Sequence, residues 1–159
     1  MNGEPITGPF LAPEIVALQQ GPAHDLFAGF DADRFPPTTR PAMTSAAAAY
    51  RVAPQVGEAF SLLVRDALWE HGRNIADPTV LAELRAELDV PDPAGEDDAS
   101  LEADLAEGRR RGVTGSPHFF TPNGDFFCPS LDISHDDSGA MRVGFDSDGF
   151  ARFMAAALG

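Results

Sequence analysis

The chain has 159 residues, 43% hydrophobic and 23% charged, which suits one globular domain with its own core. Its 25 acidic and 11 basic side chains give a net charge of −14, which argues against nucleic-acid and anionic-membrane partners. One cysteine excludes an internal disulfide framework, and no apolar run reaches the length of a membrane span. Without a basic region before an apolar segment at the amino terminus, we expect no signal peptide and a cytoplasmic protein.

The first part of the chain predicts little regular structure. Residues 6–11 resemble the end of a strand, with a proline that limits it to an edge or an irregular piece. Residues 14–20 predict a short helix that follows a proline. Residues 21–37 are rich in proline, glycine and aspartate and predict a packed loop. Its expected aromatic anchors are Phe27, Phe30 and Phe35.

Three helices are predicted next. Residues 38–52 carry a capping threonine and a first-turn proline, and residues 53–71 show the clearest helical periodicity in the chain. Gly72 is expected to end that helix, and Asp77 with the following proline to begin another. We expect Trp69 to be a packing residue. The apolar stripe of the second helix is Phe60, Leu63, Val64, Ala67 and Leu68.

An acidic linker and a polar helix follow. Residues 90–98 contain proline and glycine, and Asp97 and Asp98 predict a solvated helix start. Residues 100–111 predict a helix with arginines in its last turn, where cations complement the helix dipole.

The last part predicts short strands and one helix. Residues 117–121 and 126–128 are aromatic strands joined by a turn that contains Asn-Gly. Residues 131–139 predict a loop, residues 141–145 a further strand, and the final helix starts at Asp146 or the next residue.

The loop at 131–139 also raises the question of a metal site. Asp132, His135, Asp136 and Asp137 are oxygen and nitrogen ligands that metals use. They are nearly adjacent in a flexible loop, however, and not at the spacing of a helix face or a Cys-x-x-Cys site. We therefore predict no metal and no other cofactor.

The segment that organises this part of the chain is Arg111-Gly-Val-Thr-Gly-Ser-Pro-His-Phe-Phe120. A proline that opens a strand belongs at its first residue, at an edge or at a bulge. Gly115 permits an unusual backbone conformation before it, and X-Pro is the bond that takes the cis form at low cost. We therefore expect a tight corner that leads into a strand.

This segment resembles the cis-proline segment of thioredoxin-fold proteins, in particular of the DsbA-like family. The resemblance rests on Val-x-Gly-Ser-Pro-x-Phe at 113–119, the helix before it and the strand–strand–helix after it. It implies an α/β thioredoxin-like fold with an incomplete sheet. The whole of 1–159 would be one domain, with 38–111 as a helical insertion and 112–159 as the carboxy-terminal part.

The resemblance also implies a function and a binding site. The family carries out thiol–disulfide oxidoreduction, and its cis-proline loop holds the substrate backbone beside a reactive cysteine. Here the loop corresponds to four residues, and the Ser–Pro bond is expected to be cis. Its partner would be a peptide or protein with a thiol or disulfide, or a small thiol such as glutathione. The substrate-binding residues are Thr114, Gly115, Ser116 and Pro117.

The family's Cys-x-x-Cys motif is absent, so no catalytic residue is assigned and this chain alone is expected to be inactive in redox turnover. Either the chain lacks an amino-terminal part, or it is a shortened relative. Two alternatives remain open: an enzyme of the 2-hydroxychromene-carboxylate isomerase and glutathione-transferase-like branch, or a non-catalytic peptide-binding module. Cys128, at the end of an aromatic strand, is expected to be a structural thiol whose pKa Asp125 and Asp132 would raise.

Overall fold

The computed structural model describes residues 6–159, and this part of the chain contains six helices and four β-strands. The strands form two separate antiparallel sheets of two strands each, so the fold is mixed α/β. The chain divides into two compact units. The helical unit comprises the described residues up to Ala12 together with Asp25–Glu107, and the hairpin unit comprises Pro13–His24 and Gly108–Gly159. The single domain with an insertion at 38–111 stays a prediction.

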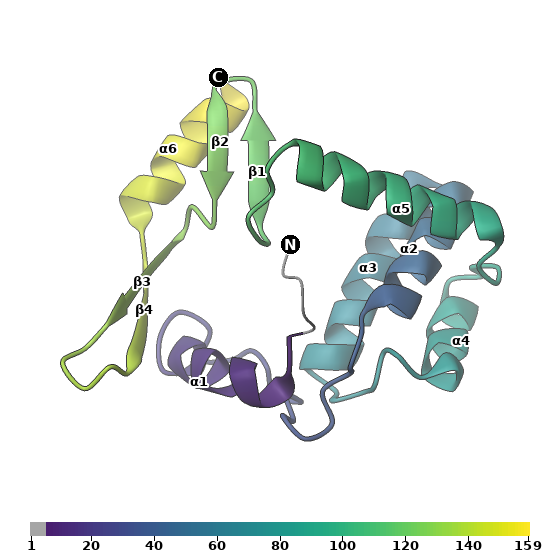
Figure 1. Ribbon diagram of the computed structural model, residues 1–159, viewed down its shortest axis with the longest axis horizontal. Coiled ribbons are helices and arrows are strands. Elements are labelled where there is room, and N and C mark those ends of the chain that lie inside the picture. Colours follow the sequence, from purple (N-terminus) through teal and green to yellow (C-terminus); the bar gives the residue numbers. More distant parts are fainter. Residues whose placement is uncertain (1–5) are drawn as a thin grey trace. The chain divides into compact units, whose positions relative to one another are not determined.

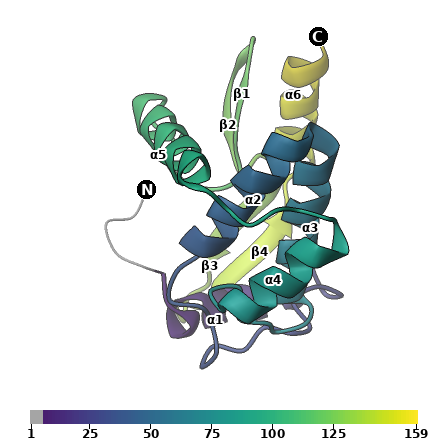
Figure 2. The same cartoon turned by 90° about the vertical axis from the view of Figure 1, so that its right-hand side faces the viewer.

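The helical unit is built around α2 (Arg40–Val52) and α3 (Pro54–Trp69), which lie side by side, with α4 (Pro78–Glu87) packed against both (Figures 1 and 2). All three helices and the apolar stripe of α3 were predicted from the sequence. Ala48 and Ala49 of α2 are fully buried, which lets the neighbouring helices approach closely. The buried core is Ala42, Ala48, Ala49, Phe60, Val64, Ala67, Leu68, Ile75, Leu81, Leu84 and Val90.

Local signals fix where these helices begin and end. Each has a proline in its first turn, where the missing N–H costs no hydrogen bond. Asp77 caps α4, because its carboxylate accepts a hydrogen bond from the Thr79 backbone N–H at 2.8 Å. Gly72 follows α3 with φ of +61°, a conformation that glycine adopts without steric cost. The predicted ends of α2 and α3 and the predicted start of α4 lie within two residues of those observed, but the N-cap residue Thr39 makes no side-chain cap hydrogen bond.

The loop that leads to α2 packs its three phenylalanines around Trp69 at the end of α3. The ring centroids of Phe27, Phe30 and Phe35 lie 5.4, 6.1 and 5.7 Å from that of Trp69. The Glu70 carboxylate accepts hydrogen bonds from the backbone N–H groups of Phe27 and the next residue, at 2.9 and 3.3 Å. Trp69 is thus a packing residue, as predicted.

The first turn of α5 (Gly95–Arg110) differs from the prediction of a solvated helix start. Asp97 is buried, and its carboxylate accepts two hydrogen bonds at 3.0 Å from the Arg51 guanidinium and one at 2.7 Å from the Ala94 backbone N–H. The expectation was wrong for Asp97 because its main partner, on α2, is distant in the sequence. Asp98 is exposed.

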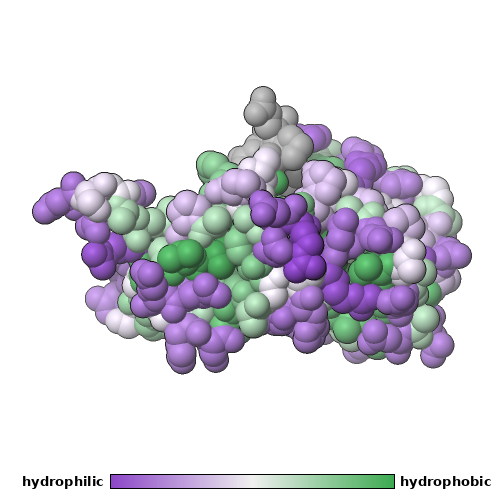
Figure 3. Space-filling model, turned by 90° about the horizontal axis from the view of Figure 1, so that it is seen from below, coloured by the Kyte–Doolittle hydropathy of each residue, from purple (hydrophilic) through white to green (hydrophobic). Residues whose placement is uncertain are grey.

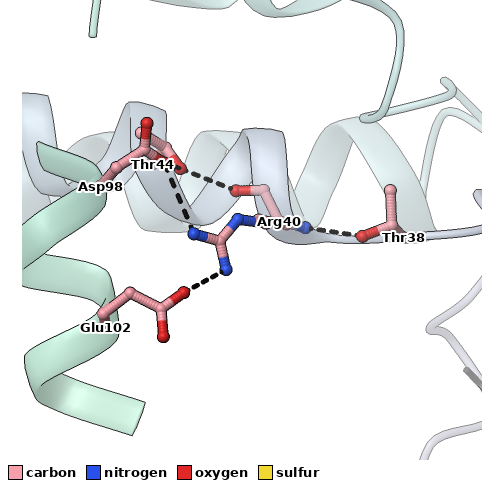
Figure 4. A network of polar contacts seen from close by, with 5 residues as sticks. All are labelled: Thr38, Arg40, Thr44, Asp98 and Glu102. Atoms are coloured by element: carbon pink, nitrogen blue, oxygen red, sulfur yellow. Dashed lines mark hydrogen bonds and ion pairs between the residues drawn. The ribbon is translucent and has the colours of Figure 1, made fainter. Parts of the chain in front are cut away.

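A second polar network connects the first turn of α2 to α5 (Figure 4). Arg40 pairs through Nη1 with Glu102 Oε1 at 2.6 Å and through Nη2 with Asp98 Oδ1 at 3.7 Å. Thr44 Oγ1 donates to the same Asp98 oxygen at 3.1 Å, and the Thr38 hydroxyl accepts from the Arg40 backbone N–H. Because Arg40, Asp98 and Glu102 are exposed, each ion pair contributes about 1 kcal/mol or less to stability.

In the hairpin unit, β1 (His118–Thr121) and β2 (Gly124–Phe127) form the predicted hairpin. Gly124 has φ of +143°, and Thr121 Oγ1 donates to its carbonyl at 2.8 Å, which closes the Asn-Gly turn. The last helix, α6 (Ser147–Leu158), begins after Asp146, whose carboxylate accepts from the Gly149 backbone N–H at 2.8 Å. Both predictions are confirmed.

A second hairpin replaces most of the loop predicted for 131–139. Its strands are β3 (Leu131–His135) and β4 (Met141–Phe145). The Asp136 carboxylate accepts hydrogen bonds across the turn, and those from the Ser138 hydroxyl, the Ala140 backbone and Arg142 lower its pKa to about 2. The loop prediction was wrong because pairing with β4, rather than local composition, makes the strand.

The amino-terminal prediction also needs correction. α1 (Gly8–Gln19) replaces both the strand end expected at 6–11 and the shorter helix expected at 14–20, and it contains Pro13. Pro9 lies in the first helical turn, where proline is well tolerated, so it did not indicate an edge strand.

None of the helices in residues 6–159 has the length and hydrophobicity that crossing a membrane requires. The face seen in Figure 3 is covered mostly by hydrophilic side chains, with smaller apolar patches between them. Scattered apolar side chains at the surface are normal in folded proteins and need no special explanation.

Candidate functional site

The four residues predicted to bind substrate form the loop between α5 and β1, in the hairpin unit. Thr114, Ser116 and Pro117 are exposed, and Gly115 is half-buried. The Ser116–Pro117 peptide bond is cis, as predicted. The loop therefore presents the side chains of three of its four residues at the surface.

Hydrogen bonds hold both ends of this loop and leave its middle open. The Thr114 backbone N–H donates to His118 Nδ1 at 3.3 Å, and the Cys128 backbone N–H donates to the Pro117 carbonyl at 3.0 Å. Gly115 and Ser116 make no hydrogen bond to any residue in 6–159. Their backbone groups can pair with an extended peptide, as the edge of a sheet does.

Three rings and a guanidinium lie on one face of the β1–β2 hairpin, next to the loop. His118 stacks on Phe120 with 4.5 Å between ring centroids and meets the edge of Phe127 at 6.1 Å. The guanidinium carbon of Arg111 lies 5.4 Å from the centroid of Phe120. Phe127 is 53% exposed, so a ligand at the loop could cover an apolar ring.

Gly115 is needed for close packing rather than for an unusual backbone conformation. Its φ is not positive, so that part of the sequence interpretation was wrong. A Cβ atom at this position would lie 2.8 Å from Cε2 of Phe127, closer than carbon atoms pack. A larger residue would have to displace the ring.

The opposite face of the hairpin is packed. The ring centroids of Phe119 and Phe126 lie 4.6 and 5.6 Å from that of Phe153 in α6.

No protein-family model, curated protein or solved structure matches this chain. The case for a site at the loop therefore rests on its geometry.

Cys128 directly follows β2 and is half-buried, with φ of +46°. Burial, and then the negative charge of Glu14 in α1, raise the pKa of its thiol. The sequence predicted a raised pKa but assigned the charge effect to Asp125 and Asp132. A thiol with a raised pKa is protonated at neutral pH and is a weak nucleophile.

We expect Cys128 to react with iodoacetamide at neutral pH more slowly than free cysteine. Glu14→Gln removes the negative charge that raises the thiol pKa, so the thiolate fraction and the labelling rate should rise. Asp132→Asn is the matched control and should leave the rate unchanged. Mass spectrometry of timed samples measures both. Rapid labelling of the wild type would contradict a structural thiol, and equal rates in wild type and Glu14→Gln would contradict the charge effect.

The candidate metal ligands near 131–139 are placed apart by the second hairpin. Asp132 and His135 are separated by an odd number of positions on β3, so they lie on opposite faces of the strand. The Asp136 carboxylate is held by the turn. Within residues 6–159, no group of three or more His, Cys, Asp or Glu is placed to hold a metal ion.

The helical unit contains a pocket of about 370 Å³ that no sequence pattern indicated. It lies between α2, α4 and the start of α5, and its lining includes Arg40 and Arg85. These residues are far apart in the sequence and have no shared motif. An arginine in the last turn of a helix, such as Arg85, has an ordinary explanation in the helix dipole.

Proposed function

We propose that the loop at 114–117 binds an extended segment of a peptide or protein that contains a thiol or a disulfide, in a thioredoxin-like domain of the DsbA-like type. The open backbone of Gly115 and Ser116 carries this proposal, because these residues lack hydrogen bonds to the rest of 6–159. A bound peptide would gain main-chain hydrogen bonds there and apolar contact with Phe127.

The proposed activity is binding without redox turnover by this chain alone. Thiol–disulfide exchange needs a thiolate to attack and normally a second cysteine to resolve the mixed disulfide. The chain has one cysteine, and the pKa of its thiol is raised. A small thiol such as glutathione is the alternative ligand of the same loop. Nucleic acid is not proposed as a partner, because the net charge of −14 repels phosphate.

A titration of ¹⁵N-labelled protein with a short extended peptide that carries a mixed disulfide with glutathione tests the proposal. We expect saturable shift changes at Gly115, Ser116 and Phe127. Gly115→Ala would displace the Phe127 ring and should weaken binding about five-fold, the equivalent of about 1 kcal/mol. Gly144→Ala in β4 is the matched control, since a Cβ there meets no atom within 4 Å, and it should bind like the wild type.

Two results would count against the proposal. Chemical-shift changes confined to residues outside the loop would show that the peptide does not bind at 114–117. Equal affinities of the two alanine variants for the peptide would show the same. Multiple turnovers in an insulin-reduction assay with the wild-type chain would show that redox chemistry does not need a second cysteine here.

A further inference from the structure

We propose that the pocket between α2, α4 and the start of α5 binds a small organic monocarboxylate. We call it the arginine pocket, after Arg40 and Arg85 in its lining. Its volume of about 370 Å³ lies within the range of small-molecule sites in proteins, roughly 300–1,000 Å³. All of its lining residues belong to the helical unit, and none belongs to the loop at 114–117.

Arg85 supplies a largely buried cation with donors to spare. Its side chain is 12% exposed, and it donates to Ser45 Oγ at 3.2 Å and to Asp92 Oδ1 at 2.7 Å. A guanidinium has five N–H donors, so some remain without a partner among the described residues. Asp92 is 90% exposed, so a ligand carboxylate can replace this weakly held partner and take a bidentate position on Arg85.

The charges around the pocket limit a ligand to one negative charge. Two arginines and Asp98 line the pocket, and Arg40 and Arg85 are already paired with Glu102 and Asp92, so a ligand carboxylate must displace one of these carboxylates. Arg40 sits at the wall formed by the first turn of α2, where Figure 4 shows it beside Asp98 and Glu102. A second negative charge on the ligand would be repelled by these carboxylates.

The rest of the lining fits a short apolar body. Pro41, Pro78 and Pro93 present rigid rings, and Leu81 is 3% exposed. Rigid walls lose little conformational entropy when a ligand binds. A short-chain or aromatic carboxylic acid would therefore place its carboxylate at the guanidinium groups and its hydrocarbon part against the prolines and Leu81.

Isothermal titration calorimetry and ligand-observed NMR with butyrate and benzoate test this inference, with inorganic phosphate and butylammonium as probes of other charge. We expect saturable binding of the carboxylates and none of butylammonium. Arg40→Gln should weaken carboxylate binding about ten-fold through loss of a charge-assisted contact. Asp98→Asn should strengthen it, because it removes a carboxylate that competes with the ligand for Arg40. Arg65→Gln, an exposed arginine of α3, removes the same charge outside the pocket and should have no effect.

The opposite signs expected for Arg40→Gln and Asp98→Asn keep the test informative even if one variant is less stable. Absence of saturable carboxylate binding to the folded wild type would overturn the inference. So would tighter binding of phosphate than of the carboxylates, or an equal effect of Arg40→Gln and Arg65→Gln.

Discussion

Phe60→Ala is expected to destabilise the helical unit by about 4 kcal/mol. Phe60 lies in α3 with no exposed surface, and it packs in the core shared with α2 and α4. Removing the ring deletes its buried apolar surface and leaves a cavity, because rigid helices close around a void only in part. Whole domains are stable by only about 5–15 kcal/mol, so this loss would bring the unit close to unfolding at room temperature.

Urea unfolding followed by tryptophan fluorescence measures the stability of the helical unit, where Phe60 lies. Trp69 is the only tryptophan and belongs to the helical unit, so its emission reports on that unit. Leu62→Ala, on the same helix but 61% exposed, is the matched control and should cost less than about 1 kcal/mol. Similar losses for the two variants would show that Phe60 is not the centre of the core.

Asp97→Asn is expected to lower the free energy of unfolding of the helical unit by about 2–3 kcal/mol. Asp97 is 2% exposed and its carboxylate accepts a bidentate pair of hydrogen bonds from Arg51. An amide in its place accepts less strongly and puts an N–H₂ group against a guanidinium. The loss stays below that of a fully buried pair, because Arg51 is 41% exposed and has Glu96 at 3.0 Å as a second partner.

The effect of this substitution should depend on pH in a definite direction. The hydrogen bond from Arg51, followed by that from the Ala94 backbone, lowers the pKa of Asp97 below 3.8. A carboxylate whose pKa is lower in the folded than in the unfolded state stabilises the fold at pH values above its unfolded pKa. This stabilisation is lost as the pH falls through its folded pKa. The difference between wild type and Asp97→Asn should thus be full at pH 7 and shrink below about pH 3.8.

Denaturant unfolding at a series of pH values measures this difference. Asp104→Asn, an exposed aspartate of α5, serves as the control and should change stability by less than about 0.5 kcal/mol. A difference that does not vary between pH 7 and pH 3 would mean that the ionised carboxylate of Asp97 does not stabilise the fold.

The sequence by itself determined those elements whose signals are local. Prolines in first turns, the Asp77 cap and Gly72 placed α2, α3 and α4 correctly. In the hairpin unit, Asn-Gly indicated the turn of the first hairpin and Asp146 indicated the start of α6. Each of these residues acts on backbone groups within a few positions, so its effect can be predicted without knowledge of the fold. The candidate loop at 114–117 could be proposed for the same reason, because its residues are contiguous.

Only the tertiary structure decided the features that depend on distant partners. β3 exists because β4 pairs with it, and Asp97 is buried because Arg51 reaches it from another helix. The arginine pocket needs three segments to meet, and its residues share no spacing that a sequence pattern could show. In each case the role of a side chain or strand depends on a partner that is far away in the sequence. Local propensity is too weak to predict such pairings.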